Sequence, residues 1–307
     1  MGRYLLGRCL RTLVALWAII SLTFLVMHLI PGNPFLAPQV APAIRQRLIV
    51  RYGLDLPLWR QYLLYWAGLL RGSLGVSMVV PGRTVREMIG AALPVSAQLG
   101  AEALGWSVTL GIVLGLLAAF HMNRTWDYVA LAVAVLGLSV PNFVIAALLD
   151  YVFAVRLRLL PVAGWGGPAH SVLPAFALGC MSLALVSRLV RFQGAEVLNL
   201  DYVRTARAKG LPWSAILARH VLRNAMLPVL TTLGPLAAAV VVGSLAIERI
   251  FAIPGLGSAF VRSILDRDYP VILGVTVFYA CVLLGFNFLV DVLYGVVDPR
   301  IRLGKED

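Results

Sequence analysis

Long apolar runs separated by short polar segments dominate the sequence. Six of them are long enough to cross the roughly 30 Å hydrocarbon layer of a bilayer as helices; they cover residues 13–30, 93–120, 128–155, 172–190, 228–247 and 271–290. The first run is longer than a secretory signal core and leads into the turn Pro31-Gly-Asn-Pro34 without a cleavage site, so we expect it to remain as a span. The pattern predicts an all-α polytopic membrane protein with six transmembrane helices in one transmembrane domain.

The polar segments between the runs predict the orientation. The orientation is predicted by comparing the numbers of Lys and Arg on the two sides of the membrane. Residues 31–92 are left out of this comparison, because the charges of so long a segment have little influence on translocation. Elsewhere, Lys and Arg are more numerous on the side that holds both chain ends and residues 191–227, so we expect cytoplasmic termini. Within the long outer loop, apolar residues recur at helical spacing at 44–52 and 58–70, which predicts amphipathic helices on the outer rim.

Composition agrees with a membrane protein and excludes a soluble one. Hydrophobic residues make up 60% of the 307 residues, charged residues 13%, and mean hydropathy is +0.88, whereas soluble domains are roughly 45–50% apolar. The net charge of +12 does not indicate nucleic-acid binding here, because the basic residues border apolar runs, where they orient spans and meet lipid head groups. Cys9, Cys180 and Cys281 lie in or beside apolar runs without pairing motifs, which indicates packed thiols.

The sequence lacks the motifs of an ATPase or hydrolase. A phosphate-binding loop needs Gly-x-x-x-x-Gly-Lys-[Ser/Thr], but Lys209 follows Ala208 and Lys305 precedes Glu306, and these are the only two lysines. Neither Gly-x-Ser-x-Gly nor His-Glu-x-x-His occurs, and the four histidines are scattered. We expect a non-enzymatic chain that holds no metal and no cofactor, with any ATP-driven work done by another polypeptide.

The segment of residues 191–227 between the fourth and fifth runs predicts two short cytoplasmic helices. Asn199 or Asp201 is suited to cap the start of the first helix, and Gly210 to end that helix in a left-handed conformation. Pro212 then begins a second helix, whose apolar face comprises Trp213, Ile216, Leu217 and Val221. Spacing alone does not distinguish a docking site from a hairpin that only links two spans.

The motifs of this segment resemble a known protein family. Arg204-Thr-Ala-Arg-Ala-Lys-Gly210, followed by His220-Val-Leu-Arg-Asn-Ala-Met-Leu-Pro228, is similar to the coupling loop of ABC importer permeases of the peptide and nickel branch. The resemblance covers the whole chain, and it is most marked for the first membrane subunit of oligopeptide permeases, through Pro94-Val-Ser-Ala-Gln-Leu-Gly100 and Leu160-Pro-Val-Ala-Gly-Trp165. Other matching motifs are Leu93-Pro-Val-Ser96, Glu248-Arg-Ile-Phe-Ala-Ile-Pro-Gly-Leu-Gly257, Asp266-Arg-Asp-Tyr-Pro270 and Asp291-Val-Leu-Tyr-Gly-Val-Val-Asp-Pro299.

The resemblance implies a transport subunit in a prokaryotic cytoplasmic membrane. Its partners would be a second, similar permease subunit, two ATP-binding subunits that use ATP and Mg, and an extracytoplasmic solute-binding protein that delivers peptides, here oligopeptides. The implied docking residues for the ATP-binding subunit are Asp201, Tyr202, Arg204, Thr205, Ala206, Arg207, Ala208, Lys209, Gly210, Leu211 and Pro212. The general pattern of importer permeases has Glu-Ala-Ala at the positions of Arg204, Thr205 and Ala206. This chain therefore has no glutamate at position 204 that could form a salt bridge with the ATP-binding subunit.

Other substrates and functions remain open from sequence alone. A dipeptide, glutathione or a nickel complex would suit the same importer class, and more distant alternatives are an ion-coupled secondary transporter and a receptor or scaffold. A secondary transporter would favour broken helices, visible repeats and paired intramembrane carboxylates, and it would not explain the helix, glycine and helix pattern around Gly210.

Residues within the spans provide two further expectations. Gly111 and Gly115 have the small-xxx-small spacing that permits close helix packing. Charges in lipid are costly and commonly face water-filled cavities, so Glu102 is the candidate for a translocation path. The other acidic residues lie nearer span ends and are interpreted as charges that reach the membrane interface; they are Asp150, Glu248 and Asp291.

Overall fold

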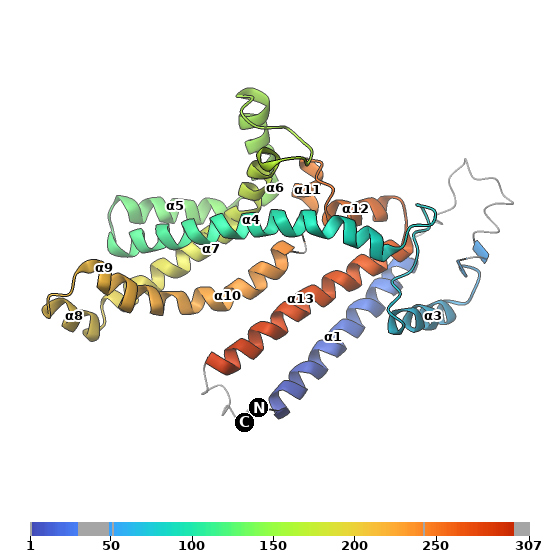
Figure 1. Ribbon diagram of the computed structural model, residues 1–307, viewed down its shortest axis with the longest axis horizontal. Helices are drawn as coiled ribbons and strands as arrows, with labels where there is room; N and C mark the ends of the chain where they lie inside the picture. The colour runs from blue at the N-terminus through green and yellow to red at the C-terminus, as the bar shows by residue number, and fades with distance from the viewer. Residues whose placement is uncertain (1, 30–48, 51, 242, 298–307) are drawn as a thin grey trace.

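The computed structural model describes residues 2–29, 49–50, 52–241 and 243–297 (Figure 1). Within these residues the chain is helical, and the only β feature is an isolated bridge between Val76 and Thr84. Five helical stretches are long and apolar enough to span a membrane; they are Gly7–Leu29, Val85–Phe120, Pro168–Leu198, Thr232–Ile250 and Tyr269–Leu289. A bent pair, Thr125–Ser139 with Asn142–Arg156, is the sixth candidate. The structure confirms the all-α polytopic class.

The described helices follow the order of the predicted spans. The first and last spans lie in α1 (Gly2–Leu29) and α13 (Tyr269–Val297), which pack side by side (Figure 1). Helix α4 (Val85–Phe120) and helix α7 (Pro168–Leu198) form the most extensive helix pair, and α5 (Thr125–Ser139) packs against both. Helix α10 (Arg223–Val241) contacts α4, α7 and α13. The bundle therefore centres on α4 and α7.

Glycines allow α4 and α7 to pack closely. A Cβ atom at Gly115 would lie 2.6 Å from the Ser187 carbonyl oxygen, and one at Gly111 would lie 2.9 Å from Val186 Cβ. The small-xxx-small pair therefore lies at a helix interface, as its spacing predicts. Trp106 of α4 adds a polar contact by donating its indole N–H to the Ala175 carbonyl oxygen at 3.0 Å.

Helix α4 begins eight residues before the predicted span, because a capping box starts it. The Thr84 hydroxyl accepts from Glu87 N at 3.2 Å, and the Glu87 carboxylate accepts from Thr84 N at 3.3 Å. These two bonds satisfy backbone donors that the helix start would leave free. The resulting 36-residue helix is roughly 54 Å long and extends beyond the hydrocarbon layer.

The run predicted as one span at 128–155 is broken in the structure. Helix α5 ends at Ser139, and helix α6 (Asn142–Leu149) continues into the π-helix η1 (Asp150–Arg156) at 106° to it. Pro141 lacks a backbone N–H and forces the preceding Val140 into an extended conformation, with φ −92° and ψ 123°. The prediction of one continuous helix here is wrong.

The fifth span is also interrupted. Helix α10 ends at Val241, Gly243 has a φ of +83°, and α11 (Leu245–Ile250) follows, with the Ser244 hydroxyl accepting from Ile247 N at 3.4 Å. The chain then turns at Ala252, which has a φ of +49°, and enters α12 (Leu256–Leu265). The segment of residues 243–265 thus folds back on itself next to α4 instead of leaving the bundle directly.

The long loop between the first two spans contains the predicted amphipathic helix at 58–70 as α3 (Leu58–Leu70). It packs against α1 through Tyr62, whose hydroxyl is 2.6 Å from Ser21 Oγ, and through Gln61, whose amide oxygen is 3.1 Å from His28 Nε2. Of the helix predicted at 44–52, all but residues 49, 50 and 52 lie outside the described residues. Figure 1 shows α3 at the end of the molecule opposite to α8 and α9.

Candidate coupling site and intramembrane polar contacts

A helix hairpin lies beyond the spans, at one end of the molecule (Figure 1). It comprises α8 (Asp201–Ala208) and α9 (Trp213–Ile216), and the π-helix η2 (Leu217–Leu222) connects it to α10. Gly210 has a φ of +73°, its N–H donates to the Arg207 carbonyl oxygen at 2.9 Å, and Leu211 N donates to the Ala206 carbonyl oxygen at 3.3 Å. This pair of bonds is the Schellman motif, which satisfies the last carbonyls of a helix and favours glycine at this position.

The start of the hairpin differs from the sequence-based prediction. Helix α7 runs to Leu198, so the first eight residues of the predicted loop 191–227 belong to that helix. Asn199 follows α7 and donates its side-chain amide back to the Ala195 carbonyl oxygen at 2.9 Å. Leu200 is the N-cap of α8, which has no side-chain cap bond. The prediction that Asn199 or Asp201 caps this helix is wrong, because the tight turn after α7 places Leu200 at the cap.

One face of the hairpin is anchored on the spans. Val203 and Ala206 of α8 are buried with Ile216 and Val221, and this cluster also includes Val197 near the end of α7. Leu116 near the end of α4 packs against the same cluster. Ala206, a predicted docking residue, therefore points inward and supports the hairpin.

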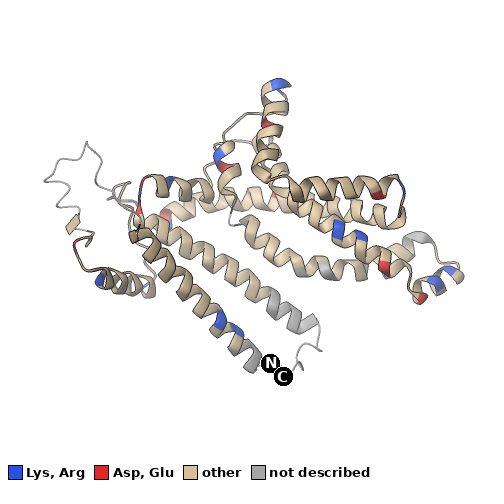
Figure 2. Ribbon diagram, turned by 180° about the vertical axis from the view of Figure 1, so that it is seen from behind, with Lys and Arg blue, Asp and Glu red and all other residues tan. Residues whose placement is uncertain are grey.

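The opposite face presents the other predicted docking residues to the surroundings. Tyr202 is half-exposed and its hydroxyl accepts from Asn224 Nδ2 at 2.9 Å, while Asp201 and Arg204 form a 3.6 Å ion pair on the surface. The remaining exposed positions are Thr205, Arg207, Ala208, Lys209, Gly210, Leu211 and Pro212. Figure 2 shows the basic residues of α8 at this end of the molecule. A short basic helix on a buried apolar base, with a fixed joint at Gly210, is suited to docking onto a protein surface.

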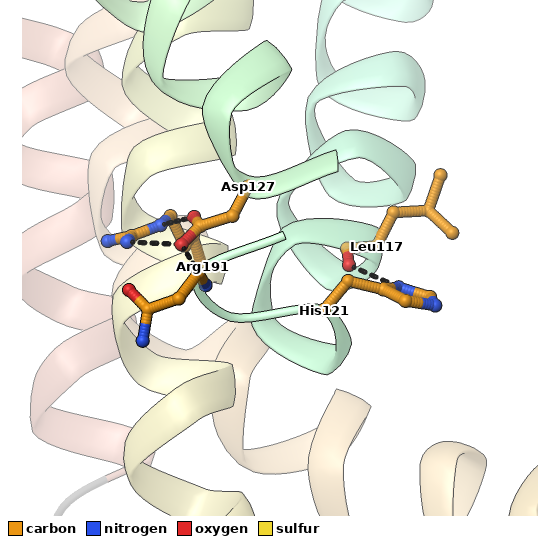
Figure 3. Close-up of polar contacts among 5 residues, drawn as sticks. Leu117, His121, Asp127 and Arg191 are labelled. Carbon is orange, nitrogen blue, oxygen red and sulfur yellow. Dashed lines mark hydrogen bonds and ion pairs between the residues drawn. The ribbon is translucent and has the colours of Figure 1, made fainter. Parts of the chain in front are cut away.

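An ion pair that sequence reasoning missed lies near the base of the hairpin (Figure 3). Arg191 of α7 binds both carboxylate oxygens of Asp127 in the first turn of α5, with Nη2 at 3.0 Å from Oδ2 and Nε at close range to Oδ1. Asn123 N also donates to Asp127 Oδ2 at 2.9 Å. The Asp127 side chain is 5% exposed and that of Arg191 is 31% exposed. The pair joins the helix that carries the hairpin to the turn between α4 and α5.

A second missed contact surrounds Glu248, which is fully buried. Its Oε1 accepts from the Ser96 hydroxyl at 2.8 Å and its Oε2 accepts from Ser258 N at 2.9 Å, while Ser96 Oγ accepts from Leu256 N at 2.8 Å. The carboxylate and the serine thus cap the start of α12, where negative charge is favourable. The interpretation of Glu248 as a charge at the membrane interface is wrong, because the fold-back of residues 243–265 encloses it.

The other intramembrane charges have less defined surroundings. Glu102 is half-exposed and accepts from Gln98 Nε2 at 2.9 Å, one turn earlier in α4. Asp150 is half-buried, and its Oδ1 makes no hydrogen bond within the described residues. The side chain of Asp291 lies outside the described residues. No cluster of three or more potential metal ligands occurs in the described part of the chain.

A membrane-spanning helical bundle with an exposed basic hairpin beyond its spans fits the class of transporter permease subunits. The sequence model for the binding-protein-dependent transport system inner membrane component matches residues 111–303. The chain belongs to this family, which confirms the resemblance to ABC importer permeases.

Full-length relatives carry the names of two kinds of peptide permease. The chain is 46% identical over 307 residues to the dipeptide transport system permease protein DppB of Bacillus subtilis, covering 100% of both chains. It is 41% identical to the DppB protein of Lactococcus lactis, over 99% of this chain and 100% of the relative. It is 39% identical to the oligopeptide transport system permease protein OppB of Escherichia coli, over 98% of this chain and 100% of the relative. Dipeptide and oligopeptide permeases are thus both relatives.

Proposed function

We propose that the chain is a membrane-spanning subunit of an ABC importer that takes up short peptides delivered by a solute-binding protein. The observation that carries this proposal is the similarity of nearly the whole chain to dipeptide and oligopeptide permeases, with 46% and 39% of residues identical. Oligopeptides are the substrate expected from the sequence motifs, and dipeptides are the alternative that the relatives support equally. Glutathione and nickel complexes belong to the same importer class and are further substrates for the test.

The proposed assembly contains a second permease subunit, two ATP-binding subunits and the solute-binding protein. ATP and Mg belong to the ATP-binding subunits, because Lys209 and Lys305 of this chain are both outside a phosphate-loop motif. In this proposal the hairpin of α8 and α9 docks onto an ATP-binding subunit in the cytoplasm, and ATP-driven movement of that subunit shifts the helices to alternate access.

The substrate class is tested by reconstituting the complete transporter in proteoliposomes with each candidate solute. We expect ATP-dependent uptake of labelled peptides, and competition between a dipeptide and a hexapeptide identifies the preferred length. The same vesicles are assayed with glutathione and nickel complexes. Uptake of these alone, or uptake driven by an ion gradient without ATP, would contradict the proposal.

Gly210→Val is expected to uncouple ATP hydrolysis from uptake. A β-branched residue is strained at the Gly210 φ of +73°. A Cβ atom there would meet no atom within 4 Å, so any displacement of the joint between α8 and α9 comes from backbone strain and not from a clash. We expect weaker binding of the ATP-binding subunit and less uptake per ATP hydrolysed, at normal abundance in the membrane. Binding is measured on inside-out and right-side-out vesicles, and binding only to the former supports a cytoplasmic hairpin.

Two matched variants separate the joint from general strain. Gly210→Asn should retain most coupling, because asparagine tolerates the left-handed conformation. Gly82 lies in the outer loop at a φ of +75° with the same open space, so Gly82→Val introduces equal strain at the other end of the molecule. It should leave binding of the ATP-binding subunit unchanged. Full coupling in Gly210→Val would mean that the hairpin only links two spans.

A further inference from the structure

A groove of about 780 Å³ runs between residues 130–139 of α5 and residues 185–192 in the hairpin-side half of α7. Its walls include Leu131, Val135 and Leu138 of α5, which are 40–54% exposed, and Phe192 of α7, which is 65% exposed. The volume lies within the range of roughly 300–1,000 Å³ that is typical of sites for small ligands. The groove is therefore large enough for a short peptide.

Polar groups distinguish this groove from a face that contacts lipid. Arg188 lines it, is exposed, and has no hydrogen bond or ion pair with another described residue. Ser187 also lines it, and its buried hydroxyl has no hydrogen-bond partner within the described part of the chain. Arg191, at the end nearer the hairpin, is neutralised by Asp127. The groove thus presents one uncompensated positive charge, and an unsatisfied hydroxyl lies buried behind its wall.

Helix α1 shows the contrasting, lipid-type surface. It exposes Leu13, Trp17, Leu22 and Leu25, and no charged residue occurs between Leu13 and Met27. Arg188 lies two residues before the end of the fourth predicted apolar run, residues 172–190, at the border of that span on the hairpin side. A charged side chain at a span border reaches water or a bound partner instead of hydrocarbon. The hairpin end of the α5–α7 groove is accordingly expected to be wet.

We infer that this groove lines the peptide translocation path and that Arg188 contacts the peptide's C-terminal carboxylate during transit. The inference rests on the proposed function and assigns the path to specific residues. Arg188 supplies the complementary charge, because a guanidinium binds a carboxylate through two parallel hydrogen bonds. The apolar walls at Val135, Leu138 and Phe192 accept side chains of varied sequence through contacts that require no fixed partner. Glu102 is not among the groove's lining residues and stays a separate prediction.

Thiol labelling of the complete transporter in membranes tests whether the groove is wet. Val135→Cys and Leu138→Cys are made in a chain whose Cys9, Cys180 and Cys281 are replaced by alanine, and Leu22→Cys on α1 is the matched control. We expect a charged, water-soluble thiol reagent to label the two groove positions at least about 50-fold faster than the control, since a charged group partitions poorly into hydrocarbon. ATP with peptide-loaded binding protein should slow the groove labelling. Reaction only with a lipid-soluble reagent, or only after the two permease subunits are separated, would overturn the inference.

Arg188→Gln tests the carboxylate contact, with Arg188→Lys as the variant that keeps the charge. Uptake is measured for two forms of one peptide, one with a free C-terminal carboxylate and one with an amidated C-terminus. The uptake of each form is divided by the measured occupancy of the binding protein by that form. We expect Arg188→Gln to slow the free acid about ten- to hundredfold and to leave the amide unchanged, as for loss of a charged hydrogen bond. Equal slowing of both, or of neither, would overturn the contact. Absence of peptide uptake by the unmodified transporter would instead contradict the proposed function, and the labelling pattern would still report on the groove.

Discussion

Replacing Glu248 with alanine is expected to lower the free energy of unfolding by about 2–6 kcal/mol. The change leaves the part-buried Ser258 N–H and the buried Ser96 hydroxyl without their acceptor, and an unsatisfied donor away from water costs roughly 1–3 kcal/mol. The start of α12 also loses the negative charge that favours it. Unfolding of the purified chain in mixed micelles measures the effect, and uptake should fall with it because the fold-back of residues 243–265 loosens from α4.

Glycine variants test the same cluster independently. A Cβ atom at Gly255 would lie 2.5 Å from both Glu248 Oε2 and Ser96 Oγ, so Gly255→Ala should also destabilise the protein, by about 1–3 kcal/mol. Gly105→Ala is the matched control, because a Cβ there meets no atom within 4 Å and alanine favours the helix. If Glu248→Ala unfolded like the unmodified chain, the carboxylate would not hold α12 in place.

The sequence predicted the spans better than their interruptions. Apolar runs and charge placement are local properties, and they were sufficient for the membrane class and for α3. Proline has no single consequence in a membrane helix, because neighbouring helices satisfy the groups it frees. Pro94 and Pro174 lie inside α4 and α7, whereas Pro141 separates α5 from α6 by 106°. Only packing decides between these outcomes, so the break could not be predicted from the run alone.

The hairpin and the buried charges show the same limit. The positive φ of Gly210 followed from local turn chemistry, since few residues other than glycine end a helix in this way. The inward position of Ala206 required knowledge of the surface beneath the hairpin. Glu248 and Ser96 are 152 residues apart, and Asp127 and Arg191 are 64 apart. Such contacts depend on how α4, α7 and the fold-back assemble, which helical periodicity does not encode.

Removing one partner of the Asp127–Arg191 pair is expected to destabilise the chain and to impair coupling. Loss of a partner from a buried ion pair typically costs about 3–5 kcal/mol. Arg191→Ala should approach this range, because it leaves Asp127 only 5% exposed and without its counter-charge. Asp127→Ala should cost less, because the Arg191 side chain is 31% exposed and reaches water. Since α7 carries the hairpin, both variants should keep binding of the ATP-binding subunit but lower uptake per ATP.

A double-mutant cycle separates the pair from its surroundings. The Asp127→Ala, Arg191→Ala double variant removes both charges, so its loss of stability should be smaller than the sum of the two single losses by about 1–3 kcal/mol. The surface pair of Arg204 and Asp201, whose side chains are 69% and 96% exposed, is the control. Asp201→Ala should cost less than about 1 kcal/mol, as for most exposed ion pairs. Additive losses at Asp127 and Arg191 would mean that the two side chains stabilise the protein independently, and the link between the hairpin-bearing helix and the α4–α5 turn would then rest on packing alone.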